Sequence, residues 1–257
     1  MTGKVDYDRV APAYDRRYTT TTYEGIADAL LSFVFPGAQV LEVGCGTGHW
    51  LGVLQSHGCS VSGVDASFGM LSGARGKVSS ARLINAVAEA LPLREAVFDR
   101  IVCINAYHHF RGRESFLAEA SRTTRAGGGL MILGLDPSQN RDRWCIYDYF
   151  PPTLALDRER YPSVEATRQT MEEAGWARVE TRLAERLQLQ VPARVALEQG
   201  VLDKRFTSQL TLLSEADYRA GIARIEAEAR SAEARGEVLE LRTDVHLFAT
   251  IGWKTAA

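Results

Sequence analysis

Short apolar runs alternate with amphipathic segments along the first half of the chain. The runs are typical of strands buried on both faces, as in Ile101–Ile104. The segments between them carry apolar residues at helical spacing, as Ile26, Leu30 and Phe33 do. The predicted strands cover residues 40–43, 61–64, 82–85, 99–104 and 130–133, and the predicted helices cover residues 26–34, 48–57, 67–76 and 114–125. This alternation predicts an α/β fold of parallel βαβ units with helices on both faces of one sheet.

The second half follows a different pattern. A stretch rich in arginine and aromatic residues, 141–161, precedes a helix predicted over 164–174. Apolar residues then alternate with polar ones at 187–191 and again at 245–253, which predicts two strands paired antiparallel at the end of the sheet. Between them, a helix with Tyr218, Ile222 and Ile225 on one face ends near Gly236. Residues 192–237 are therefore predicted to form an insertion.

Composition and charge make several classes of partner and site unfavourable. The formal net charge of −2 leaves no basic excess, so nucleic acid is a disfavoured partner. No apolar run approaches the ~20 residues of a membrane span, and the first residues do not resemble a signal peptide. The cysteines lack metal-ligand or disulfide spacing, which predicts free thiols in a cytoplasmic protein and no metal site. They are Cys45, Cys59, Cys103 and Cys145.

The strongest functional signal is the glycine-rich turn in Val40-Leu41-Glu42-Val43-Gly44-Cys45-Gly46-Thr47-Gly48. Glycines after a strand let the backbone turn sharply and approach a ligand, and the following helix directs free N–H groups to the same point. The next strand ends at Asp65, where a carboxylate can accept both hydroxyls of a ribose. The glycine turn and this acid together indicate an adenosine-containing ligand. The spacing of Gly44, Gly46 and Gly48 differs from the G-x-G-x-x-G of dinucleotide-binding proteins.

These residues resemble the class I, S-adenosylmethionine-dependent methyltransferases of the small-molecule type, which includes ubiquinone- and menaquinone-biosynthesis enzymes. The resemblance covers about residues 5–135: the glycine turn, Asp65, the segment 88–93, and a lid-like segment at 7–15. Val87 stands where the family often has an acid, which leaves a backbone carbonyl to meet the adenine amine. The cofactor-binding residues that the resemblance implies are Tyr14, Gly44, Gly46, Asp65, Ala66, Met70, Ala88, Glu89 and Asn105.

The strand that ends at Ile104 continues into Asn105-Ala106-Tyr107-His108-His109, which is expected to face the transferred methyl group. His108 or His109 is a candidate general base, because imidazole titrates near neutral pH. The alternative is that the pair anchors this loop. The segment also lacks the Asn/Asp-Pro-Pro-Tyr sequence of amino-modifying methyltransferases and the Pro-Cys pair of cytosine C5 methyltransferases.

The acceptor is predicted to be a small molecule. Its candidate binding residues are Tyr7, Arg143, Trp144 and Tyr147, because arginine can hold an anionic group and aromatic rings can stack. The alternative is a helix whose aromatic residues pack on the sheet.

The resemblance implies a seven-stranded, mostly parallel Rossmann-like sheet in the order 3-2-1-4-5-7-6, with a helical cap. The expected organisation is one methyltransferase domain over residues 1–257, with a lid at 1–22 and cap insertions at 137–163 and 192–237. The expected activity is methyl transfer from S-adenosylmethionine to oxygen, nitrogen or carbon, with S-adenosylhomocysteine as product. A homodimer is a further possibility. The competing hypotheses are a nicotinamide-dependent oxidoreductase, an RNA-modifying methyltransferase and a non-catalytic S-adenosylmethionine-binding protein.

Overall fold

One sheet runs through the computed structural model, which describes residues 5–205 and 207–256. Five parallel strands in the order β3-β2-β1-β4-β5 continue into β8, which is antiparallel to β5 and also pairs with β7 and β6. The strands are β1 (Gln39–Val43), β2 (Ser60–Asp65), β3 (Arg82–Asn85), β4 (Phe98–Ile104), β5 (Thr124–Leu135), β6 (Arg143–Trp144), β7 (Ala177–Pro192) and β8 (Glu240–Trp253). The predicted order 3-2-1-4-5-7-6 is confirmed for the seven longer strands, and the two-residue β6 was not predicted.

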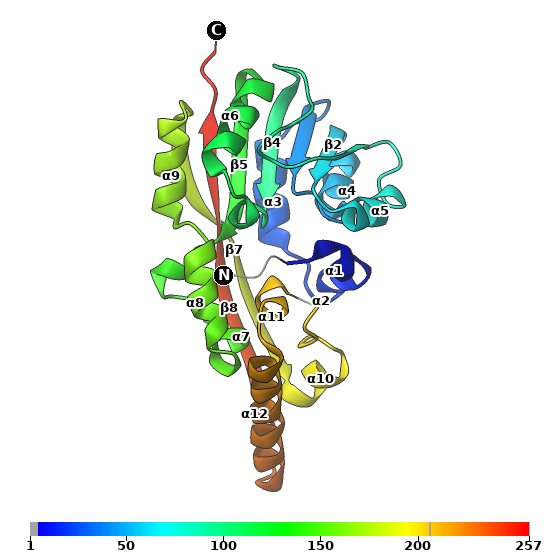
Figure 1. Cartoon of the computed structure of the whole chain (residues 1–257), viewed down its shortest axis with the longest axis vertical. Helices are drawn as coiled ribbons and strands as arrows, with labels where there is room; N and C mark the ends of the chain where they lie inside the picture. Colours follow the sequence, from blue (N-terminus) through cyan, green and yellow to red (C-terminus); the bar gives the residue numbers. More distant parts are fainter. Residues whose placement is uncertain (1–4, 206, 257) are drawn as a thin grey trace.

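Helices cover both faces of the sheet, as predicted (Figure 1). Residues of β4 alternate between the two cores: Val102 packs on one face with Leu30 and Leu51, and Ile101 packs on the other with Phe116. The continuous apolar run in this strand therefore fills two cores at once. The helices of these layers are α3 (Glu24–Phe33), α4 (His49–Ser56), α5 (Phe68–Arg75), α6 (Arg113–Thr123) and α9 (Val164–Glu173).

The strands β7 and β8 extend beyond the rest of the sheet. The pairing of β5 with β8 ends at Leu135 and Leu247, whereas β7 and β8 stay paired with each other as far as Pro192 and Glu240. This extension is called the ribbon below, and it comprises residues 185–192 and 240–247. Cap helices surround it in the lower half of Figure 1. They are α7 (Cys145–Tyr149), α8 (Pro152–Arg160), α10 (Ala193–Glu198), α11 (Ser208–Thr211) and α12 (Glu215–Ala234).

The cap has an apolar core of its own. Phe150, which directly follows α7, Leu210 from α11 and Ile225 from α12 are buried in it, together with Leu241 from the ribbon. The segments 137–163 and 192–237, predicted to be insertions, supply these helices. The ribbon thus links the cap to the main sheet.

The sequence predicted only the distal part of β7. The strand begins at Ala177, ten residues before the predicted start at 187, and its register against β8 shifts between Leu183 and Glu185. A bulge of this kind reverses which residues face the same side, so a single alternating pattern cannot cover the strand.

Candidate functional site

The glycine turn joins β1 to α4. Gly44, Gly46 and Gly48 have φ angles of +77°, +52° and +78°, the left-handed region that favours glycine. A Cβ on Gly44 would lie 2.3 Å from the Cβ of Ala106. The turn therefore packs directly against the loop after β4, and glycine is required there for both conformation and space.

Asp65 ends β2 beside this turn. Its two carboxylate oxygens accept hydrogen bonds from the backbone N–H groups of Gly46 and Ser67, each at 2.8 Å. Burial raises the pKa of Asp65. Glu42 lies buried in β1, where burial and then the charge of Asp65 raise its pKa well above the usual range. The Oε2 atom of Glu42 has no hydrogen-bond partner among the described residues.

The lid consists of α1 (Tyr7–Tyr14) and α2 (Arg17–Thr20), and Met1–Lys4 of the predicted lid lie outside the described residues. Helix α1 packs against α5, and Val10 buries Met70. The Asp8 carboxylate accepts hydrogen bonds from the Ser67 hydroxyl at 2.6 Å and from the Gly69 N–H at 2.7 Å. The lid is thus attached to the helix that follows Asp65.

A second attachment joins the lid to the glycine turn. The Thr47 hydroxyl donates to Asp15 at 2.5 Å, and Lys77 forms an ion pair with the same carboxylate. Tyr14 approaches Gly46 closely enough that a Cβ there would lie 3.6 Å from its ring. Tyr14 was predicted as a site residue from the sequence, whereas Asp8 and Asp15 were not, although both belong to the segment that resembled a lid.

The predicted adenine-side residues lie on two segments. Met70 is buried in α5 and Ala66 is exposed just before it, whereas Ala88 is buried in the loop after β3. Glu89 accepts hydrogen bonds from the backbone N–H groups of Arg111 and Gly112, which fixes the loop before α6. The cofactor contacts of these residues stay predictions.

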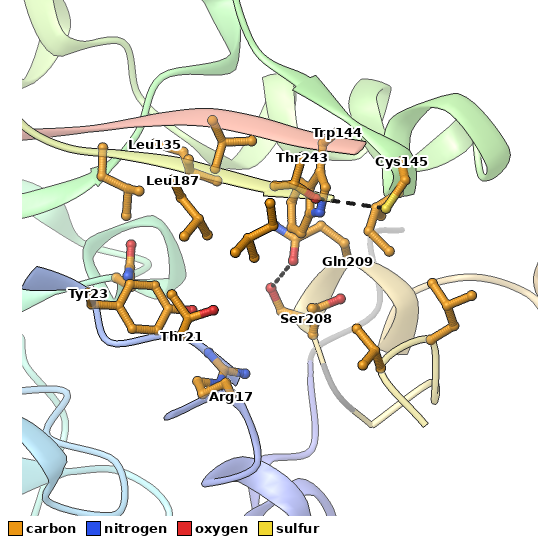
Figure 2. Close-up of a pocket in the computed structure, with 18 of the residues that line it drawn as sticks. Arg17, Thr21, Tyr23, Leu135, Trp144, Cys145, Leu187, Ser208, Gln209 and Thr243 are labelled. Carbon is orange, nitrogen blue, oxygen red and sulfur yellow. Dashed lines mark hydrogen bonds between the residues drawn. The ribbon is translucent and has the colours of Figure 1, made fainter. Parts of the chain in front are cut away.

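A cavity of about 450 Å³ lies between the lid, the end of the main sheet and the ribbon. Figure 2 shows Arg17 and Tyr23 on the lid side of it, and Leu187 and Trp144 on the opposite side. The lid and the loop after β4 supply mostly polar groups, and the ribbon supplies apolar ones apart from Thr243. The lining from the lid and that loop comprises Tyr7, Tyr14, Arg17, Thr19, Thr21, Tyr23, Asn105, His108 and His109.

The two histidines at this cavity are both desolvated. Burial, and then the positive charge of Arg160, lowers the pKa of His109 to about 3. Its Nε2 atom shares a hydrogen bond of 2.5 Å with the Tyr7 hydroxyl. Burial likewise lowers the pKa of His108 well below its usual range. Its ring stacks on Tyr161 at 3.8 Å, and its Nε2 atom has no hydrogen-bond partner among the described residues.

The structure brings some of the predicted acceptor residues to the cavity and places others elsewhere. Tyr7 and Trp144 line it. Arg143 is exposed on β6 and is absent from the described lining. Tyr147 is also absent from it: this side chain is buried and donates a hydrogen bond of 2.9 Å to Asp157. The ribbon residues were missed, although their alternation was recognised.

Residues 5–205 and 207–256 hold neither a candidate metal site nor a candidate membrane-spanning helix. No group of three or more His, Cys, Asp or Glu side chains in these ranges could hold a metal ion. Within the same part of the chain, no helix combines the length and the apolar character needed to cross a bilayer.

Comparison with known proteins connects this geometry to a family. Residues 41–132, which contain the glycine turn, Asp65 and the histidine pair, match the methyltransferase domain family. Over these residues the chain is similar to a methyltransferase domain. The resemblance predicted from the sequence is therefore confirmed.

Curated methyltransferases are similar to about half of the chain. A demethylmenaquinone methyltransferase of Tropheryma whipplei is 31% identical over 49% of this chain and 56% of the relative. A malonyl-[acyl-carrier protein] O-methyltransferase of Pectobacterium atrosepticum is 32% identical over 48% of each chain. The matches thus span about half the length of these curated relatives.

The methyltransferase fold extends beyond that match. A candidate methyltransferase from an antibiotic biosynthesis pathway of Anabaena variabilis superposes with a TM-score of 0.68 at 21% identity. This superposition covers 88% of the present chain and 96% of the other. At that identity the likeness shows the fold alone.

Proposed function

We propose that the chain transfers a methyl group from S-adenosylmethionine to an oxygen, nitrogen or carbon atom of a small molecule. One observation carries the proposal: Asp65 and the glycine turn lie at the edge of the sheet where the cavity begins, at Tyr14 and Asn105. In open α/β sheets, ligands bind in the crevice outside the carboxyl ends of the strands. The matched family and the activities of the relatives support the same chemistry.

The residues at this edge fit S-adenosylmethionine. Each carboxylate oxygen of Asp65 accepts one backbone N–H, and a second lone pair stays available for a ribose hydroxyl. The unpartnered Oε2 of buried Glu42 marks a polar position beneath the turn that a ligand can satisfy. Met70, Ala66 and Ala88 would contact the adenine.

The bound cofactor supplies a methyl group on a positively charged sulfur. In that transfer the methyl carbon would pass from sulfur to the acceptor atom, the electron pair of the broken carbon–sulfur bond would stay on sulfur, and the proton lost by the acceptor would pass to water. The chain contributes chiefly alignment, which can supply several kcal/mol of the barrier reduction. Tyr14 and Asn105 lie between the glycine turn and the cavity and would orient the two reactants.

The histidines are better suited to positioning the acceptor than to removing its proton. A general base works best when its pKa is near the working pH, and His109 has a pKa of about 3. Both rings are therefore neutral near pH 7 and able to form hydrogen bonds. The unpartnered Nε2 of His108 is a position where a polar atom of the acceptor would be stabilised.

Calorimetric titration with S-adenosylmethionine, S-adenosylhomocysteine and NAD tests the cofactor. We expect the first two to bind and NAD not to bind. Asp65→Ala should weaken binding by about 1–3 kcal/mol, because the ribose hydroxyls lose their partner. Asp99→Ala is the matched control: Asp99 also accepts a backbone N–H, from Gln39, but it lies at the opposite edge of the sheet.

Equal losses in the two variants would refute the role of Asp65, and binding of NAD alone would replace methyl transfer with hydride transfer. Transfer of a labelled methyl group to an added acceptor then separates an enzyme from a protein that only binds the cofactor. Binding without transfer to any acceptor class would favour the non-catalytic alternative.

A further inference from the structure

The ribbon presents a face to the cavity that is apolar except for Thr243. Beyond the pair Leu135–Leu247, β8 has no β5 partner, and β7 and β8 form a two-stranded wall with only β6 added. Three successive cross-strand pairs on the same face line the cavity. They are Leu187–Val245, Leu189–Thr243 and Val191–Leu241.

This face is not simply the core of the cap. Leu187, Leu189 and Val191 are only half-buried, whereas the residues between them, Gln188 and Gln190, are exposed on the outer face. Apolar side chains that line a hollow lose contact with water when an apolar ligand enters. The inner face of the ribbon therefore has the character of a binding wall.

The charges around the cavity narrow the class of ligand further. The described lining contains no aspartate or glutamate, and its one lysine or arginine is Arg17, whose guanidinium lies 3.8 Å above the Tyr14 ring. A buried charged group needs a partner of opposite charge or several hydrogen bonds. An ammonium group against the ribbon would have no carboxylate within this lining. A carboxylate or phosphate against the ribbon would lie across the cavity from Arg17, which is on the lid side (Figure 2).

The polarity of the lining also changes along the cavity. Asn105, His108 and His109 form a polar end beside the glycine turn, and the ribbon forms a mostly apolar wall. The polar groups near that wall are Thr243 of the ribbon and Gln199, Thr207, Ser208 and Gln209 of the cap. The cavity volume of about 450 Å³ falls within the roughly 300–1,000 Å³ of pockets for small organic ligands. A ligand with one polar atom beside Asn105 and the histidines, and a hydrocarbon body along the ribbon, would match the polarity of both parts of the cavity.

We infer that the methyl acceptor is an uncharged, largely apolar molecule with a hydroxyl group, whose hydrocarbon body lies against the inner face of the ribbon. This inference rests on the proposed function, since it assigns the cavity to the methyl acceptor. It makes Leu187, Leu189 and Val245 specificity-determining residues.

Three phenols that share the hydroxyl group and differ in the charge of the opposite end provide the test. They are 4-pentylphenol, which is neutral, tyramine, which is a cation, and 3-(4-hydroxyphenyl)propanoate, which is an anion. Each is titrated by calorimetry into the full chain saturated with S-adenosylhomocysteine. We expect 4-pentylphenol to bind at least tenfold more tightly than either charged phenol. The inference is overturned if a charged phenol binds as tightly as 4-pentylphenol or more tightly, or if none of the three phenols binds.

A pair of variants places the ligand on the ribbon. Leu189→Glu adds a carboxylate to the inner face, and Gln190→Glu adds the same group to the outer face one residue later. The first should weaken binding of 4-pentylphenol at least tenfold and narrow its advantage over tyramine. The second should change its affinity less than twofold. Equal effects of the two substitutions would reject the ribbon as the binding wall.

Titration with S-adenosylhomocysteine reports both folding and the proposed function. Both variants should bind it like the unmodified chain, because the ribbon is at the far end of the cavity from the glycine turn. An unmodified chain that binds 4-pentylphenol but not S-adenosylhomocysteine would refute the proposed function and leave an apolar cavity. A chain that binds S-adenosylhomocysteine but not 4-pentylphenol would refute only the inferred class of acceptor.

Discussion

Replacement of Gly44 by alanine measures how tightly the glycine turn is packed against the loop that carries the histidines. Two costs arise from the structure. A residue with a Cβ at φ +77° pays about 1–2 kcal/mol for the left-handed conformation. The new Cβ would also lie 2.3 Å from that of Ala106, so the turn and the loop must separate, and overpacking of this kind costs about 1–3 kcal/mol. We expect a total loss of about 2–5 kcal/mol of unfolding free energy.

Gly37→Ala is the matched control. Gly37 has a φ of +85°, and a Cβ there would meet no atom within 4 Å. Only the conformational cost of about 1–2 kcal/mol should apply. The difference between the two variants, measured by urea denaturation, therefore isolates the steric contact and should be about 1–3 kcal/mol.

A second substitution tests whether Ala106 is the residue that the new Cβ would strike. Ala106→Gly removes the atom that the new Cβ would strike, so the double variant Gly44→Ala, Ala106→Gly should recover most of the steric cost. Equal losses for Gly44→Ala and Gly37→Ala would show that the contact is not tight. Additive losses in the double variant would show that Ala106 is not the obstacle.

Two further predictions concern buried polar groups. Because the pKa of His109 is lowered to about 3 from an unfolded value of about 6.5, its contribution to stability is complete above pH 6.5 and is lost as the pH falls toward 3. The stability advantage of the unmodified chain over His109→Gln should thus shrink by about 1.4 kcal/mol per pH unit below 6.5; urea denaturation at pH 7.5, 6 and 5 measures it, and a constant difference would contradict the assigned pKa. Asp157 is fully buried and pairs with Arg160, so Asp157→Ala should cost about 3–5 kcal/mol by leaving that charge uncompensated. A loss below 1 kcal/mol in thermal or urea denaturation would show that Arg160 finds another partner.

Local patterns were sufficient to predict the glycine turn and the acid beside it. Glycines at alternate positions after a strand indicate a left-handed turn wherever the strand lies, and Gly44, Gly46 and Gly48 adopt that conformation. Parallel strands bring their carboxyl ends to one edge, so Asp65 was predictable as a neighbour of the turn. Its hydrogen bond to the Gly46 N–H confirms that proximity.

Contacts between distant segments were not predictable in the same way. Asp15 reaches Thr47 and Lys77, and Tyr147 donates to Asp157 instead of lining the cavity. A sequence pattern shows that such side chains are polar or aromatic, but it does not show which groups lie within reach after folding. The predicted acceptor residues were therefore less informative than the predicted glycine turn.

By itself, the sequence determined the α/β class, the order of the elements, and the glycine turn with its neighbouring acid, because periodicity and backbone conformation are local properties. Only the tertiary structure decided what the apolar face of the ribbon contacts. Alternation at 187–191 shows that Leu187, Leu189 and Val191 share a face. Whether that face packs in a core or borders a cavity depends on where β5 stops pairing and where the cap helices lie, and those are properties of the whole fold.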